Sequence, residues 1–141
     1  MSRLLLVIAS LLLFTGCGDK LSLNGKVQFA DGKPLTVGIV CFQGTGITAR
    51  APIQADGTFR VSTVKKDDGI SPGSYKVFIA GAYIGDSSVK GDPKSDGGIP
   101  EGNITPLIDE KLMNPDTSGI ICEVKSGMKL PFIIEVKEPA K

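Results

Sequence analysis

The chain has 141 residues, with 16 lysines and arginines against 15 aspartates and glutamates, and it contains no histidine. The missing histidine excludes Ser-His-Asp and Cys-His catalytic triads, histidine-ligated zinc and the commonest general base near neutral pH. The charge is almost balanced, and the only basic run, Lys65-Lys66, is cancelled by Asp67-Asp68, so we expect a solvated turn there and no nucleic-acid partner.

The first sixteen residues have the three parts of a signal peptide. Arg3 supplies the positive part, 4–14 is an apolar run too short to span a bilayer, and Gly16 is the small residue before a cleavage site. A cysteine follows at once, so the segment resembles a bacterial lipoprotein signal, although Phe14 stands where Leu, Val or Ala is usual. An ordinary secretory peptide and an uncleaved anchor helix are the alternatives.

The lipoprotein resemblance implies that Cys17 carries two or three acyl chains. Each buried methylene contributes about 0.8 kcal/mol, so several chains make a durable membrane anchor. The expected location is the cell envelope, on the inner or outer membrane, facing the periplasm or the exterior. We therefore divide the chain into a signal peptide (1–16), a lipidated tether (17–23) and one domain (24–138) with a long loop at 81–119.

The domain has the composition of strands and turns. Glycine and proline are frequent, and short apolar runs alternate with polar residues. The expected strands are 26–29, 37–42, 58–64, 74–80, 119–125 and 130–136, with a seventh at 51–54. Asp-Gly pairs at 31–32 and 56–57 mark turns. This pattern predicts an all-β fold, a seven-stranded (six to eight) antiparallel Greek-key β-sandwich.

Six segments carry a family resemblance, namely 25–27, 31–35, 56–59, 72–77, 106–111 and 114–119. They are similar to the carboxypeptidase regulatory-like, transthyretin-like domains found in short lipoproteins of planctomycete-type bacteria. The resemblance implies a transthyretin-like (prealbumin-like) sandwich. Its matched residues form turns and strand cores, so it implies no activity. Members of the wider fold that hydrolyse 5-hydroxyisourate use histidines, which this chain lacks.

Strand alternation places the other two cysteines on opposite sides of their strands. Cys122 lies between Ile120 and Val124 and faces the core, whereas Cys41 lies between inward-facing Val40 and Phe42. A disulfide needs Cα atoms within about 7 Å and converging Cβ vectors, so we expect free thiols. A bulge in either strand would reverse the facing, so a Cys41–Cys122 disulfide is the second alternative.

The stretch 81–103 is long and polar for a connection inside one domain. It contains the weak ligand-binding candidates Tyr83, Asp86, Asp92 and Asp96. The aspartates do not follow the spacing of a calcium-binding loop, and lysines lie among them. We expect a loop that closes over the sheet edge; a partner-contacting loop comes second and a calcium site third. No metal or other cofactor is expected.

These patterns predict a non-enzymatic, lipid-anchored module that makes protein contacts in the cell envelope. The alternative is a carbohydrate- or peptide-binding surface lipoprotein, for which Tyr83 is the sole aromatic candidate. A hydrolase is disfavoured, because the chain lacks histidine and its carboxylates fall mostly in turns. The expected partners are the membrane, through lipid at Cys17, and an envelope protein. Edge strands of the sandwich are expected to pair with other chains, including further copies of this one.

Overall fold

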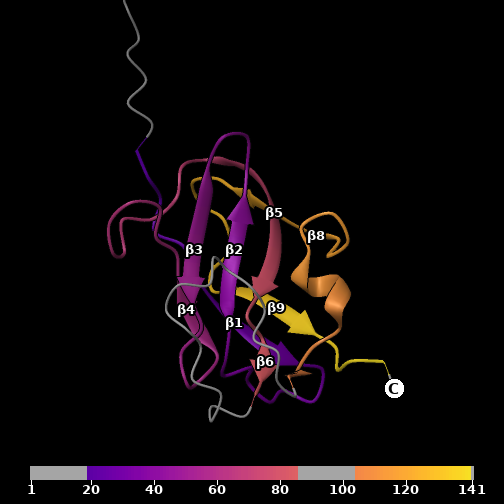
Figure 1. The fold of residues 1–141 in the computed structure, drawn as a ribbon. Helices are drawn as coiled ribbons and strands as arrows, with labels where there is room; N and C mark the ends of the chain where they lie inside the picture. Colours follow the sequence, from indigo (N-terminus) through magenta and orange to yellow (C-terminus); the bar gives the residue numbers. More distant parts are fainter. Residues whose placement is uncertain (1–18, 86–103, 141) are drawn as a thin grey trace, which may run out of the picture.

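Two facing sheets form the domain in a computed structural model, which describes residues 19–85 and 104–140 (Figure 1). One sheet has the order β4 (Thr58–Arg60), β1 (Asn24–Phe29), β9 (Phe132–Val136). The other has the order β3 (Thr48–Pro52), β2 (Ile39–Gln43), β5 (Gly73–Ala80), β8 (Ile120–Val124). The predicted seven-stranded, all-β sandwich is confirmed.

Smaller elements complete the described part of the chain. Two short strands, β6 (Tyr83–Ile84) and β7 (Thr105–Pro106), pair as a separate ribbon. A 3₁₀ helix, η1 (Glu110–Met113), precedes β8 and is capped by the Asp109 carboxylate. Among the residues described, no helix is both long and apolar enough to cross a membrane.

The first and last strands of the domain, β1 and β9, pair with each other in the three-stranded sheet. β1 and β9 run parallel, with Gly25 opposite Phe132 and Phe29 opposite Val136. The other strand pairs of the described structure are antiparallel. The prediction of a wholly antiparallel sandwich is wrong for this pair. Hydrophobic alternation is the same in parallel and antiparallel strands, so it carries no information on pairing direction.

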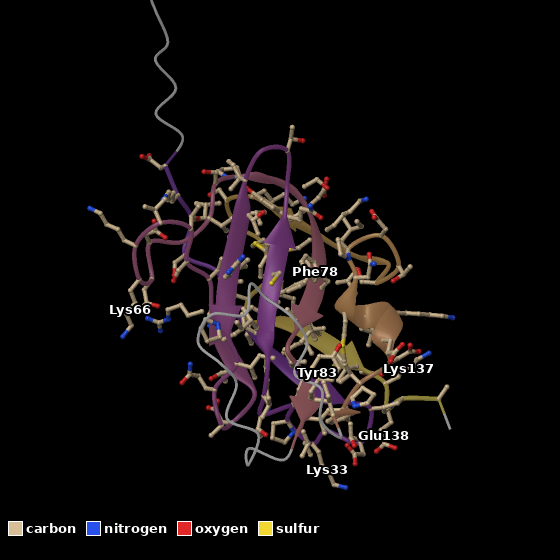
Figure 2. The ribbon with its side chains drawn as sticks, in the orientation of Figure 1. Lys33, Lys66, Phe78, Tyr83, Lys137 and Glu138 are labelled. Atoms are coloured by element: carbon tan, nitrogen blue, oxygen red, sulfur yellow. The ribbon has the colours of Figure 1, made fainter. Side chains whose placement is uncertain are left out.

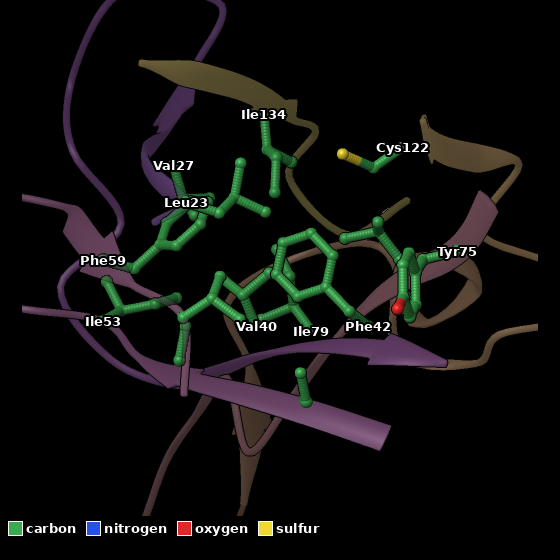
Figure 3. Packing of buried hydrophobic residues seen from close by; sticks show 14 of the residues in the cluster. Leu23, Val27, Val40, Phe42, Ile53, Phe59, Tyr75, Ile79, Cys122 and Ile134 are labelled. Atoms are coloured by element: carbon green, nitrogen blue, oxygen red, sulfur yellow. The ribbon is translucent and has the colours of Figure 1, made fainter. Parts of the chain in front are cut away.

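The core lies between the two sheets, where period-two alternation brings apolar side chains together (Figure 3). Phe42 of β2 packs against Phe59 of β4, with ring centroids 6.1 Å apart and planes tilted by 50°. This spacing lies within the range of favourable aromatic pairs. The Tyr75 hydroxyl donates a 2.8 Å hydrogen bond to the Ser71 carbonyl oxygen, so its polar end is satisfied at the edge of the core.

Two expected domain boundaries need correction. The sequence predicts a tether that includes Leu23, but Leu23 is fully buried and Leu21 exchanges backbone hydrogen bonds with Ile70. The folded domain therefore begins before residue 24. The sequence also predicts one long loop at 81–119, yet the described parts of this stretch contain β6, β7 and η1. Both corrections follow from long-range packing, which local turn and strand patterns do not report.

Gly25 is required for the close approach of β1 to its neighbours. A methyl group at this position would overlap the Phe132 carbonyl oxygen and the Phe59 ring. We predict that Gly25→Ala lowers the free energy of unfolding by about 1–3 kcal/mol, the usual cost of overpacking. Chemical denaturation of Gly85→Ala is the control, because a methyl group there makes only an ordinary 3.5 Å contact with Ile104. Equal stability of the two variants would contradict this packing.

Candidate functional site

The ligand site predicted around the long loop is only partly within the described residues. Tyr83 lies on β6 opposite Pro106, and its side chain is exposed (Figure 2). Ile84, the next residue of β6, is also exposed. Asp86, Asp92 and Asp96 lie outside the described residues, as does the predicted lipidation site Cys17. Within residues 19–85 and 104–140, no cluster of three or more cysteine, aspartate or glutamate side chains could hold a metal ion.

The two described cysteines are free thiols on opposite faces of the four-stranded sheet. Cys122 pairs with Tyr75 and lies in the core, whereas Cys41 pairs with Phe78 and lies on the outer face. The expected facing is therefore confirmed. Cys41 is nevertheless only 5% exposed on that outer face, which alternation alone did not predict.

Burial makes both thiols poor nucleophiles. It raises the pKa of Cys122 to about 11 and also raises the pKa of Cys41, against which the positive charge of Arg50 acts in the opposite direction. The thiolate is the reactive form of cysteine, so both groups stay protonated near neutral pH. These thiols are suited to packing and not to catalysis.

An open groove of about 1250 Å³ lies along the seam where β3 and β4, the edge strands of the two sheets, meet. Arg50 and Ser62 join the sheets there through two backbone hydrogen bonds of 2.9 Å. The basic residues that line this groove are Lys26, Arg50, Arg60, Lys65 and Lys66, and Asp67 is the one acidic residue among the described lining. We call this feature the basic groove.

The loop 63–69 forms one wall of the basic groove and is organised by the Asp68 carboxylate. This carboxylate accepts hydrogen bonds from the backbone N–H groups of Thr63 at 2.7 Å and of Val64 and Lys65 at 3.1 Å. It also pairs with the Lys20 ammonium group at 2.5 Å. The ion pair with Lys20 and the backbone donors hold the pKa of Asp68 well below its usual range.

The charge distribution at this loop differs from the sequence expectation. The turn at 65–68 is confirmed, but Asp68 points back to its own loop and to Lys20, so it does not cancel Lys65 and Lys66. The groove draws its basic residues from four separate places in the chain: position 26, position 50, position 60 and the pair 65–66. Sequence spacing alone gives no signal of this gathering.

No protein-family model matches the chain, and comparison with curated proteins and with solved structures finds no similar protein. The candidate sites therefore rest on the geometry of this chain alone.

Thiol chemistry tests the cysteine arrangement. We predict that residues 19–141, which exclude Cys17, contain two free thiols that react slowly with a disulfide reagent in the folded domain and rapidly in guanidinium. Burial and raised pKa values are the reason. Cys41→Ser and Cys122→Ser should each leave one reactive group. A non-reduced mass lower by two hydrogens would reveal a disulfide instead.

Acid unfolding tests the role of Asp68. Its pKa is lowered in the folded state, so its contribution to stability is present above the ordinary aspartate pKa of about 3.9 and is lost as pH falls below that value. We predict that Asp68→Asn lowers the melting temperature at pH 7 and reduces the loss of stability on acidification below about pH 4. Thermal scans at several pH values measure both effects.

Asp67→Asn is the control for that experiment. Asp67 adopts the left-handed backbone conformation, with φ of 59°, which asparagine also tolerates. Its backbone N–H donates to the Ser62 hydroxyl at 2.8 Å, and the substitution leaves that bond in place. The same acid profile in both variants would show that Asp68 has no special role.

Proposed function

We propose that the protein is a lipid-anchored extracytoplasmic module that acts through protein contacts in the cell envelope and has no enzymatic activity. The single observation that carries the contact role is the open edge of β8. This strand ends the four-stranded sheet, and no other described backbone segment pairs with its outer side. An unpaired strand edge can accept a strand from another chain.

The side chains on β8 support the same proposal. Ile121 is 57% exposed on the outer face of the sheet, beside Lys76 of β5. A shallow surface pocket next to it is lined by Gln43, Ser74 and Asp116 among others. An exposed apolar residue with polar neighbours beside an open strand edge combines backbone pairing with a side-chain anchor. The ion pair between Lys76 and Asp116, at 2.9 Å, lies at the rim of this surface.

The anchor part of the proposal is supported by the leader at 1–16 and by the small residue before Cys17. The transthyretin-like resemblance supports it further, because the same turn and strand motifs occur in short lipoproteins. The two packed sheets form a folded domain that a short tether would hold near a membrane. The module would then present β8 to an envelope protein.

A second candidate function is carbohydrate or peptide binding near the β6–β7 ribbon. The exposed side chains of Tyr83 and Ile84 on β6 favour it, since exposed aromatic and apolar groups provide stacking surfaces for such ligands. Thermal stabilisation by a panel of oligosaccharides and peptides, lost in Tyr83→Ala, would favour this function over the protein-contact module.

Membrane fractionation tests the anchor. We predict that the whole chain, expressed in a bacterium that processes lipoproteins, enters the membrane fraction with an acylated N-terminal Cys17 in its intact mass. Cys17→Ser should prevent acylation and leave the protein unprocessed or soluble. Cys41→Ser is the matched control and should behave like the original chain. An unacylated chain cut at another residue would contradict the anchor.

Photocrosslinking tests the β8 contact. We predict that a photoreactive residue at Ile121 forms a discrete protein adduct in intact cells, because the strand edge and this side chain contact a partner. Ile39, 37% exposed on the internal strand β2 of the same sheet, is the matched control position, because β2 has a paired strand on each side. Equal adducts from both positions, or none from position 121, would contradict the proposal that β8 contacts a partner.

A further inference from the structure

The basic groove lies next to the point where the chain enters the domain. Lys20 pairs with Asp68 of loop 63–69, and Leu21 exchanges two backbone hydrogen bonds with Ile70, at 2.8 and 2.9 Å. Cys17 precedes Lys20 by three residues, which span at most about 11 Å of extended chain. Lipid attached at Cys17 would therefore lie close to this loop.

The positive charges of the basic groove are not neutralised by carboxylates of the described residues, so they can attract an anionic ligand. None of Lys26, Arg50, Arg60, Lys65 and Lys66 forms an ion pair with a carboxylate of the described residues. The ion pairs that do form in residues 19–85 and 104–140 involve Lys20, Lys33 and Lys76. Arginine and lysine side chains together provide donors that match phosphate oxygens.

One apolar side chain stands at the basic wall of the groove. Val64 is 81% exposed and directly precedes Lys65 and Lys66. An exposed apolar residue beside basic residues suits the boundary between lipid headgroups and acyl chains, where the apolar group is buried and the cations meet phosphate. A nucleic-acid backbone provides no such apolar layer, so this combination favours a lipid surface.

We propose that the basic groove binds the phosphate headgroups of anionic lipids, and that the β3–β4 seam is the membrane-facing side of the domain. The orientation rests on the proposed lipid anchor at Cys17. The headgroup binding rests on the groove itself. In this arrangement, β8 lies at the far edge of the four-stranded sheet from β3 and remains open to a partner (Figure 1).

The test uses residues 19–141, which lack Cys17 and cannot be acylated. This part contains every residue of the described core, from Leu21 to Val136. Deletion of residues 1–18 therefore leaves the core packing intact. We predict that it sediments with vesicles of equal parts phosphatidylcholine and phosphatidylglycerol and not with phosphatidylcholine vesicles. Added salt should weaken the binding, because exposed charges are screened.

Two double variants with the same change of charge locate the site. Lys65→Gln with Lys66→Gln should lower the vesicle partition coefficient about thirtyfold, since each basic residue near an anionic surface contributes roughly fivefold. Lys33→Gln with Lys137→Gln is the matched control, because these residues lie away from Lys66 (Figure 2). The control should bind like the original domain. Val64→Ser should weaken binding without changing its salt dependence.

The outcomes separate this inference from the anchor. No binding to the mixed vesicles, or an equal loss of vesicle binding in both double variants, would overturn headgroup binding by the groove. This holds even if fractionation establishes acylation at Cys17. Inorganic phosphate added at matched ionic strength separates the two sources of phosphate. If it protects the domain from thermal unfolding while vesicles do not retain it, the ligand is a free phosphate and the lipid proposal is wrong. Headgroup binding without acylation would support the groove as a lipid-binding site and contradict the lipid anchor at Cys17.

Discussion

The smaller sheet, and through it the packing between the two sheets, relies on the parallel pairing of β1 with β9. β1 is the central strand of its sheet, so it holds the last strand of the chain on one side and β4 on the other. The close approach at Gly25 brings the Phe59 ring over the strand, and this ring meets Phe42 of the opposite sheet. The Phe59 ring thus links the pairing within the smaller sheet to the packing between the two sheets.

The same strand fixes where the N-terminal segment leaves the domain. Leu23 is buried directly before β1, and its carbonyl oxygen accepts a 2.9 Å hydrogen bond from the Val61 N–H. This contact carries Leu21 to Ile70 and Lys20 to Asp68, which orders loop 63–69 beside the entry point. The position of the basic groove relative to the N-terminus therefore follows from core packing at Leu23 together with the Lys20–Asp68 ion pair.

The sequence predicts features that depend on neighbouring residues, such as strand positions and facing. It does not predict contacts between residues far apart in the chain. Alternation at Val27, Phe59 and Val77 predicted their strands and their inward facing, because one buried face imposes period two. The strand predicted at 51–54 lies at Thr48–Pro52, since Ala49 and Ala51 are small and give a weak apolar signal. The parallel pair and the burial of Leu23 depend on partners far along the chain, which no local pattern reports.

The candidate sites divide in the same way. The opposite facing of Cys41 and Cys122 followed from alternation within each strand, whereas the basic groove needs four chain segments to meet. The sequence predicts Asp68 only as part of a solvated turn, because its partner Lys20 is 48 positions away. Such pairings arise from the topology of the sandwich. They become visible only once β1, β3, β4 and the loop after β4 are placed together.

Depth-dependent fluorescence would show whether the β3–β4 seam and loop 63–69 face a membrane. The chain contains no tryptophan, so one introduced at an exposed position is the sole reporter. In the membrane-bound whole protein, we predict that lipids with brominated acyl chains quench the fluorescence of the Val64→Trp variant and leave that of the Ile84→Trp variant unchanged. Equal quenching of both, or stronger quenching at position 84, would contradict it.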